Sequence, residues 1–349
     1  MEIDNVDKLV FRVIEQVAAD NCDLDKVIEF VVSFSFENSL SAETLLKLSA
    51  IFTKEGMYRE KYVISRACAS LFSGRVREDA LMEAGKTASL LSFEERAARE
   101  FEEVLKENPN SIEALSGYGI VLAKMGKLDS ARIQYEKVLE LHSYHVETLC
   151  NYGCLLFRLN RMDEAEEAYR KALLLDSRNV DAHCRYGILL SKNGEKTGAN
   201  YHFVQALELD PEHVESNFRY ARLLEEKGEP LEAERHYIVA LKADPESPKP
   251  HLFYARLLAD HGIVHGARVH FRYALKLNPK DVESHCEYAR LLARFGHRHE
   301  AEVQYKKALE LDPGHFGTLY GYGDLLKEKG QYTEAEEIYR QAEFFKRSA

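Results

Sequence analysis

The chain has 349 residues and a formal net charge of −11, with 45% hydrophobic and 30% charged residues. This composition is typical of a folded protein and lies well away from that of disordered chains. The acidity argues against nonspecific binding of nucleic acids, which requires a basic surface. The six scattered cysteines do not form a disulfide framework, which predicts a reducing compartment.

The sequence contains no run of about 18 apolar residues, so no membrane span is predicted. The first five residues, Met1 to Asn5, include two acids, which is wrong for a secretory signal and for an arginine-rich presequence. We therefore expect a cytoplasmic protein without a membrane span.

Residues 1–77 predict helices that do not follow a repeat. An apolar stripe runs from Val6 to Val17, a second apolar stretch covers 27–36, and residues 44–72 resemble a helix hairpin. We expect a helical N-terminal extension that caps the structure behind it. A module for dimerisation or partner docking is the alternative.

Residues 78–111 predict a degenerate copy of the repeat that follows. The first half keeps little of the pattern beyond Leu81 and Gly85. The second half begins at Ser92-Phe93-Glu94-Glu95, which predicts a capping box, and it ends at Pro109.

From residue 112 to residue 349 one 34-residue pattern occurs seven times without a gap. Each unit has a tyrosine, a leucine four residues later and an alanine thirteen residues after the tyrosine, as in Tyr118, Leu122 and Ala131. A period of this length indicates a solenoid of stacked repeats. The predicted units are 112–145, 146–179, 180–213, 214–247, 248–281, 282–315 and 316–349.

The pattern predicts a pair of helices in each unit. In 180–213, apolar residues recur at helical spacing on both sides of Asn193-Gly194, where glycine allows the chain to turn. Gly187 and Ala199 are small, so we expect the paired helices to approach most closely there. The repeated tyrosines are interpreted as core residues between the paired helices, with hydroxyls that reach polar neighbours.

These features resemble the tetratricopeptide repeat. The residues that carry the resemblance are the turn glycines, the invariant alanines and the closing prolines, among them Gly126, Gly194, Gly228, Pro211, Pro245, Pro279 and Pro313. Asn160 replaces one turn glycine, and asparagine also tolerates the left-handed conformation. The resemblance implies an all-α, right-handed solenoid (superhelix) of antiparallel helix pairs, which acts as a non-enzymatic scaffold or adaptor. It also implies that the first helix of each pair lines a concave groove that binds partner proteins.

The sequence gives no sign of catalysis or of a cofactor, because it lacks a phosphate-binding loop, a nucleophile elbow and paired zinc-ligand motifs. Cys150, Cys154 and Cys184 could bind a soft metal, but we interpret them as small apolar residues. Seven histidines cluster between His251 and His299, where His265 and His299 are expected to stack. We interpret this cluster as surface histidines near turns, with metal binding or pH sensing as alternatives.

Arginines at the predicted groove positions are the candidate binding residues. Arg222, Arg256 and Arg290 recur at 34-residue spacing, Arg185 and Arg219 form an offset pair, and Arg294 lies one helical turn after Arg290. Such a strip suits acidic side chains, a C-terminal carboxylate or phosphate. The alternative is pairing within the helix, with Glu226, Asp260, Asp181 and Glu215 for Arg222, Arg256, Arg185 and Arg219. Only Arg290, which faces Arg294, has no acid at that spacing.

The same groove does not match the clamp with which some tetratricopeptide co-chaperones hold acidic C-termini, since only Asn151 and Arg185 fit it. RNA binding by the groove arginines is the alternative function.

Phe344 and Phe345 lie on the last predicted helix, either folded back on their own unit or forming a contact surface. A homodimer through the N-terminal extension or through this end is a further expectation.

Overall fold

The structure is a computed structural model that describes residues 2–19 and 22–348. Within these ranges all regular structure is helical, and no strand is present. The chain divides into two compact units, Met1–Arg185 and Tyr186–Ala349. The last residue of the seventh predicted repeat, Ala349, lies outside the described residues.

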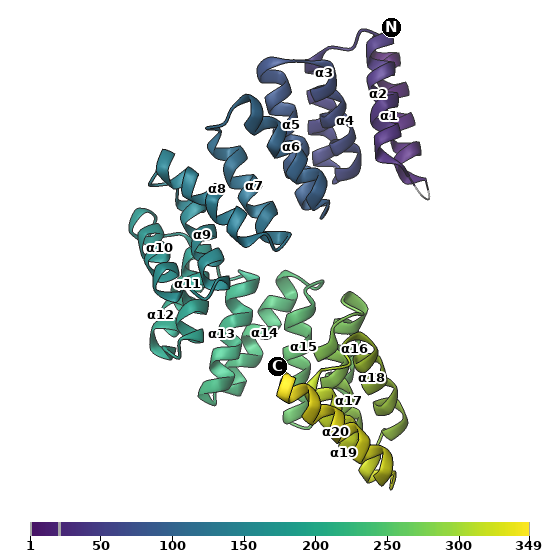
Figure 1. Ribbon diagram of the computed structural model, residues 1–349, viewed down its shortest axis with the longest axis vertical. Coiled ribbons are helices and arrows are strands. Elements are labelled where there is room, and N and C mark those ends of the chain that lie inside the picture. The colour runs from purple at the N-terminus through teal and green to yellow at the C-terminus, as the bar shows by residue number, and fades with distance from the viewer. Residues whose placement is uncertain (1, 20–21, 349) are drawn as a thin grey trace. The chain divides into compact units, whose positions relative to one another are not determined.

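The first unit is a stack of helices joined by short turns (Figure 1). Its helices are α1 Glu2–Ala18, α2 Leu24–Glu37, α3 Ala42–Lys54, α4 Tyr58–Leu71, α5 Gly74–Leu90, α6 Glu94–Glu107, α7 Ile112–Lys124, α8 Leu128–Leu141, α9 Val146–Arg158 and α10 Met162–Leu175. Helix α11, Val180–Lys192, begins in this unit and continues into the second. Helices α1–α4 and the start of α5 cover most of the described residues up to 77, while residues 1, 20 and 21 of the predicted extension lie outside the described residues.

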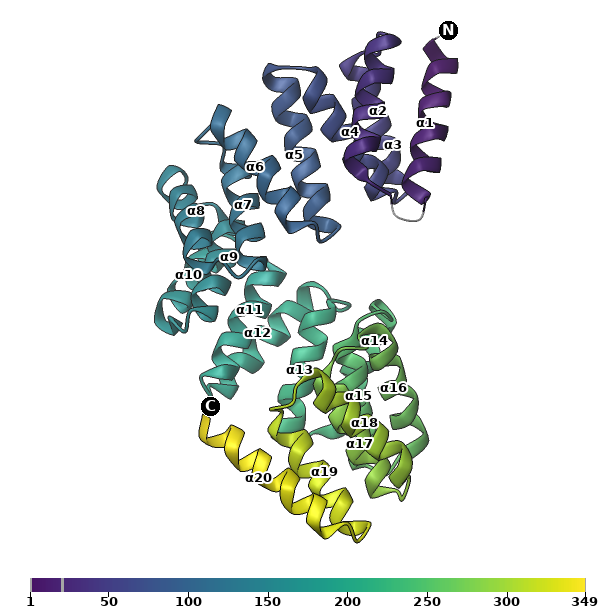
Figure 2. The same ribbon diagram turned by 45° about the vertical axis from the view of Figure 1, so that its right-hand side comes forward.

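The second unit continues with helices of nearly constant length (Figure 2). They are α12 Lys196–Leu209, α13 Val214–Lys227, α14 Pro230–Ala243, α15 Pro248–Asp260, α16 Val264–Leu277, α17 Val282–Arg294, α18 Arg298–Leu311, α19 Phe316–Glu328 and α20 Tyr332–Ser348. The helices pack as the pairs α13/α14, α15/α16, α17/α18 and α19/α20. First helices also contact each other, α15 with α17 and α17 with α19, so the unit has a first-helix layer and a second-helix layer.

Left-handed residues make the turns inside the pairs. Gly194 has a φ of 83°, and Asn160 takes its place in the α9–α10 turn with a φ of 60°, as expected. Ser92 adopts the same conformation, with a φ of 57°. The predicted capping box is therefore wrong: Phe93 occupies the N-cap of α6 without a side-chain hydrogen bond, because Ser92 forms the turn before it.

Small residues bring the paired helices together at the expected place. Ala199 is fully buried, and a Cβ atom added to Gly187 would lie 2.8 Å from the ring of Phe203 on α12. A larger side chain would force the two helices apart, because packed interiors have few voids. This confirms the role predicted for Gly187 and Ala199.

The hydroxyls of the repeated tyrosines reach polar neighbours as predicted, but Tyr152 and Tyr254 are only half-buried and pack against Tyr135 and Tyr237 of the preceding repeat. The hydroxyl of Tyr152 donates to Glu136 at 3.0 Å, and that of Tyr254 donates to Glu234 at 2.9 Å. Both acids lie on the preceding second helix, so these tyrosines pack between helices while their hydroxyls reach a polar neighbour.

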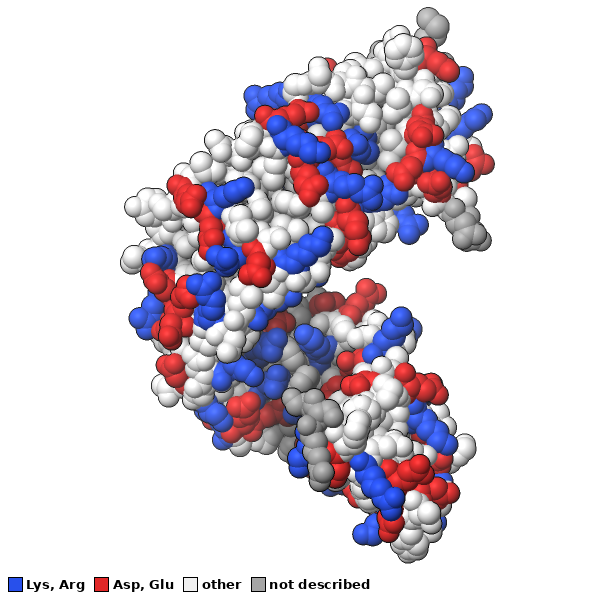
Figure 3. Space-filling model, viewed as in Figure 1, with Lys and Arg blue, Asp and Glu red and all other residues white. Residues whose placement is uncertain are grey.

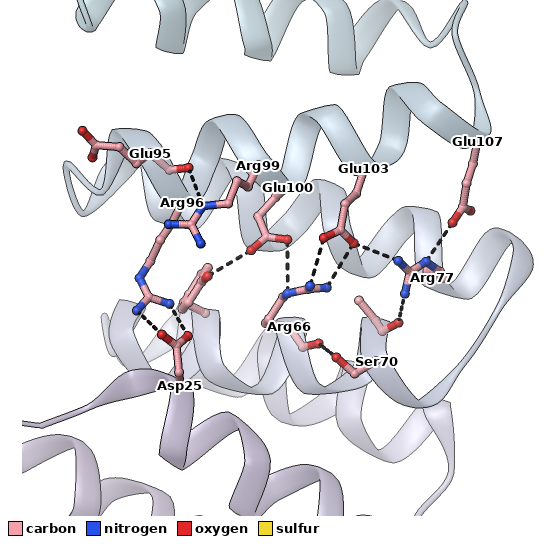
Figure 4. A network of polar contacts seen from close by, with 12 residues as sticks. Asp25, Arg66, Ser70, Arg77, Glu95, Arg96, Arg99, Glu100, Glu103 and Glu107 are labelled. Carbon is pink, nitrogen blue, oxygen red and sulfur yellow. Dashed lines mark hydrogen bonds and ion pairs between the residues drawn. The ribbon is translucent and has the colours of Figure 1, made fainter.

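A buried network of charges joins helices of the first unit (Figure 4). Glu100 on α6 is only 3% exposed, accepts a hydrogen bond from Tyr62 at 3.0 Å and lies 3.4 Å from Arg66 on α4. Arg66 also binds Glu103, with Nη2 3.0 Å from a carboxylate oxygen. Burial raises the pKa of Glu100, and the charge of Arg66 opposes this rise. The network fixes α4 against α6.

Candidate functional site

An aromatic ring that contacts two arginines is the most distinctive feature of the first-helix layer. The guanidinium of Arg222 on α13 lies 4.6 Å from the ring centroid of Phe253 on α15, and that of Arg256 lies 4.8 Å from it. All three side chains are half-buried. Stacking on an aromatic face attracts a guanidinium and leaves the N–H groups at its edge available.

The ion pairs within the helix, which are the alternative interpretation of these two arginines, do not form among the described residues. Glu226 instead binds Lys196, with Nζ 3.2 Å from its carboxylate. Among the described residues, neither Arg222 nor Arg256 forms an ion pair. Phe253, which is not among the predicted site residues, contacts both guanidiniums instead.

A half-buried acid lies beside this cluster. Glu225 accepts a hydrogen bond from the hydroxyl of Tyr237 on α14. Burial raises the pKa of Glu225, while the hydrogen bond from Tyr237 and the charges of Arg256 and Arg222 lower it. Glu225 therefore balances part of the local positive charge.

Arg219 forms the ion pair within its own helix that was the alternative to a binding role. Its Nε lies 2.6 Å from Glu215, and its guanidinium is 5.2 Å from the ring centroid of Phe218. Arg219 and Arg222 line a pocket of about 300 Å³ together with Lys249 and two acids, Asp281 and Glu283. The charge of this pocket is mixed, with a slight basic excess.

The prediction that Arg290 lacks an acidic partner is wrong. Its Nη1 lies 2.8 Å from Glu287, three residues earlier on α17. Residues three apart face each other on a helix as well as residues four apart do, so the residue four positions away does not by itself identify the partner. Arg294 donates to the carbonyl oxygen of Ala259 at 3.5 Å and lies 5.6 Å from the ring centroid of Phe295.

Arg256, Arg290 and Arg294 line a second pocket, of about 410 Å³. Its acidic lining residues are Asp260, Glu287, Asp324 and Glu328. Figure 3 shows basic side chains gathered over α13 and α15 with acidic side chains beside them. The predicted basic strip is therefore a row of arginines bordered by acids.

The remaining predicted site residues lie elsewhere. Arg185 belongs to the first unit, where it is half-buried close to Cys154, Tyr169 and Asp181. At the end of α20, Phe344 is 67% exposed. The ring of Phe345 lies against Gly314, 3.2 Å from the position of an added Cβ, so Phe345 folds back on the α18–α19 turn.

The surface interpretation of the histidine cluster is wrong for three of its members. His251 and His285 are 7% and 6% exposed, and His270 is half-buried. His251 Nδ1 lies 2.9 Å from His270 Nδ1 on α16, and its Nε2 donates to the carbonyl oxygen of Pro245 at 3.0 Å. His285 makes the equivalent contacts with Gln304 and Pro279, at 2.7 and 3.1 Å.

The same pairing occurs one repeat earlier. Asn217 donates to the carbonyl oxygen of Pro211 at 2.9 Å, and its side-chain oxygen lies 2.8 Å from Nδ1 of His236. These polar pairs connect the first and second helix of a repeat. The sequence signal was a polar residue four positions into the first helix, with a second polar residue 19 positions later. The rings of His265 and His299, by contrast, are exposed, and no contact between them is found in the part of the chain described.

The cysteines show no metal-binding geometry. In residues 2–19 and 22–348, no group of three or more His, Cys, Asp or Glu side chains is arranged to hold a metal ion. Burial raises the pKa of Cys150 to about 11, so its thiol stays protonated at neutral pH.

Among the helices described, none combines the length and apolar character that a bilayer-spanning segment requires.

Comparison with known proteins identifies the repeat. Tetratricopeptide repeat (TPR) models match residues 95–145, 146–179, 202–235 and 221–282. The model of the cilia and flagella-associated protein 70 middle TPR-like domain matches residues 264–348. No curated protein matches the chain.

Solved structures show the same fold. The pilF structure from Pseudomonas aeruginosa is 21% identical, with 62% of this chain and 97% of that chain covered and a TM-score of 0.54. A tetratricopeptide repeat protein from Parabacteroides merdae is 17% identical, with 76% and 98% covered and a TM-score of 0.53. With its stacked helix pairs and these matches, the chain is an all-α solenoid that belongs to the tetratricopeptide repeat family.

Proposed function

We propose that this protein is a non-enzymatic scaffold that holds an acidic segment of a partner protein against the first-helix layer of its second unit. Tetratricopeptide repeats generally mediate protein–protein interactions and are typically not catalytic. The finer assignment rests on one observation, the stacking of both Arg222 and Arg256 on the ring of Phe253.

The stacked arginines suit a carboxylate for two reasons. Their guanidiniums are held in place by the ring, so little side-chain freedom is lost when a ligand binds. Neither is neutralised by an ion pair among the described residues, so the N–H groups can bind a carboxylate in the bidentate geometry. The partner's acidic side chains would therefore lie over α13 and α15.

The neighbouring pocket adds a second requirement. Asp260 and Glu328 line it beside Arg290 and Arg294, and Arg290 is already bound to Glu287. A uniformly acidic segment would meet repulsion there. We infer that the segment is acidic where it crosses α13 and α15 and carries basic or neutral polar residues over α17 and α19.

RNA is a weaker fit to the same surface. Single-stranded nucleic acids bind where cations follow the backbone and aromatic faces stack on bases. Two guanidiniums and the ring of Phe218 already contact the ring of Phe253, and acids border the arginines. These features favour a protein partner over RNA.

The test compares Arg222→Glu/Arg256→Glu with a control of equal charge change, Lys137→Glu/Lys242→Glu. Both control lysines are exposed on second helices and form no ion pair among the described residues. Quantitative proximity labelling in cells should show partners lost with the first variant and retained with the control. Peptides made from the acidic segments of those partners should bind the arginine variant at least about tenfold more weakly.

Arg290→Glu/Arg294→Glu should weaken binding less, because Arg290 already binds Glu287. An unchanged partner set in the Arg222→Glu/Arg256→Glu variant would show that the cluster is structural. Tight binding of polyuridine at physiological salt, lost in the same variant, would favour the RNA function instead.

We further propose that the protein works in the cytoplasm. The match of residues 264–348 to a model named for cilia and flagella makes a ciliary or flagellar assembly the specific setting to test. Fluorescent tagging at either terminus in a ciliated cell would decide this, since uniform cytoplasmic signal would exclude enrichment there.

A further inference from the structure

A second basic surface lies on the second-helix layer, and it is separate from the groove arginines. Residues 261–280, which contain α16, include Arg268, Arg272, Lys276 and Lys280 and no aspartate or glutamate. In a chain with a net charge of −11, such a stretch concentrates positive charge on one helix.

Most of these cations are not neutralised by the protein. Arg268 binds Glu300, with Nη2 2.9 Å from its carboxylate. Arg272 and Lys276 are exposed and form no ion pair in the described ranges, and the same holds for Lys307 on α18. The neighbouring Lys306 does have a partner, Glu302, at 2.7 Å. Three unpaired cations on α16 and α18 are therefore available to a ligand.

These three cations line one pocket. It has a volume of about 500 Å³ and includes the apolar residues Leu275, Pro279 and Leu311. Its acidic lining residue is Glu310. The charge balance is thus strongly basic, in contrast to the pocket at Arg290, where four acids accompany three arginines. The volume is within the range of about 300–1,000 Å³ typical of ligand pockets.

We propose that this basic pocket binds an acidic protein segment that places an apolar side chain among Leu275, Pro279 and Leu311. Carboxylates of the segment would bind Arg272, Lys276 and Lys307, while the apolar side chain packs against Leu275, Pro279 and Leu311. The pocket uses none of the groove arginines, so the scaffold can hold one partner on each helix layer.

Two other anionic partners fit less well. Tyr273 is the exposed aromatic residue beside Arg272 and Lys276, but its ring stacks on His251, with centroids 5.4 Å apart and an interplanar angle of 14°. That face is not open to a nucleic-acid base. A lipid bilayer is flat on this scale, whereas a pocket of about 500 Å³ lined by residues of α16, α17 and α18 suits a single protruding side chain.

The experiment selects ligands without assuming their sequence. A display library of short random peptides is panned against the full chain carrying Arg222→Glu/Arg256→Glu, which removes the groove cluster. We expect the enriched peptides to be rich in Asp and Glu and to share one large apolar residue. Their affinity, measured by fluorescence anisotropy, should fall at least about tenfold in a chain that also carries Arg272→Glu/Lys276→Glu. The Lys137→Glu/Lys242→Glu change should leave it unaltered.

Several results would overturn the proposal. Enriched peptides without excess acid, or acidic peptides that bind the Arg272→Glu/Lys276→Glu chain equally well, would exclude the basic pocket as their site. Polyuridine or phosphatidylserine vesicles that bind through Arg272 and Lys276, where the peptides do not, would assign it to another class of ligand. Because the groove cluster is absent throughout, failure here is distinguishable from failure of the groove proposal.

Discussion

The histidine pair His251–His270 predicts a loss of stability in mild acid. The carbonyl of Pro245 can only accept, so His251 donates from Nε2, and its neutral Nδ1 accepts the hydrogen bond from Nδ1 of His270. Burial and the nearby His251 lower the pKa of His270 from 6.5 to about 4. The folded protein therefore binds this proton less readily than the unfolded chain does.

The direction and size of the change in folding stability with pH follow from this difference in pKa. The contribution of His270 is fully present above pH 6.5 and is lost as the pH falls toward 4, because the unfolded chain takes up the proton first. Complete loss corresponds to about 3 kcal/mol, and about 2 kcal/mol is lost by pH 5.

The matched substitution is His270→Gln, because glutamine occupies the equivalent position in the next repeat, where Gln304 pairs with His285. The hydrogen bond to His251 should survive, so stability at pH 7.5 should change by less than about 1 kcal/mol. At pH 5 the variant should be more stable than the wild type by about 2 kcal/mol.

Urea unfolding followed by circular dichroism at both pH values gives these differences. His299→Gln, which replaces an exposed histidine, is the control. Parallel loss of stability in the wild type and in His270→Gln would refute the reasoning, as would an equal benefit from His299→Gln.

Three further substitutions test the packing. Asn160→Val should cost about 1–2 kcal/mol, because a branched side chain disfavours a φ of 60°, whereas Asn160→Gly should not destabilise; equal urea midpoints would contradict this. Gly187→Val should lower the free energy of unfolding by about 1–3 kcal/mol through its clash with Phe203, and an unchanged thermal midpoint would mean that the ring moves aside. Arg66→Leu should destabilise the first unit by about 3 kcal/mol, since it removes the ion-pair partner of the buried Glu100; amide hydrogen exchange in α4 and α6 should rise, and unchanged protection would argue against the network.

The repeat pattern was sufficient to predict the helices and their turns. Gly187 and Asn160 could be placed correctly because both positions recur in every unit. A small residue stands where the paired helices approach, and Asn160 stands where other units have a turn glycine. Ser92 could not, because a serine before Glu94 and Glu95 fits both an N-cap and a left-handed turn. The division into an extension, a degenerate repeat and seven repeats stays a prediction.

The candidate site was harder to predict because it depends on contacts between helices. Arg222 and Arg256 were identified by spacing, but their stacking on Phe253 requires α13 and α15 to lie side by side. The acid that binds Arg290, Glu287, stands three residues before it, so a pattern of pairs four residues apart does not include it. The burial of His251 likewise depends on α16, which no single-helix pattern shows.

The polar pairs have a consequence for exchanging repeats between proteins. Within one repeat, Nδ1 of His285 contacts the side chain of Gln304. Its Nε2 donates to the carbonyl of Pro279, which lies before the start of α17. A module cut at Val282 would separate the histidine from this acceptor. Grafting should therefore move the junction upstream of the proline, so that each transplanted segment carries its own loop, helix pair and complete set of buried hydrogen bonds.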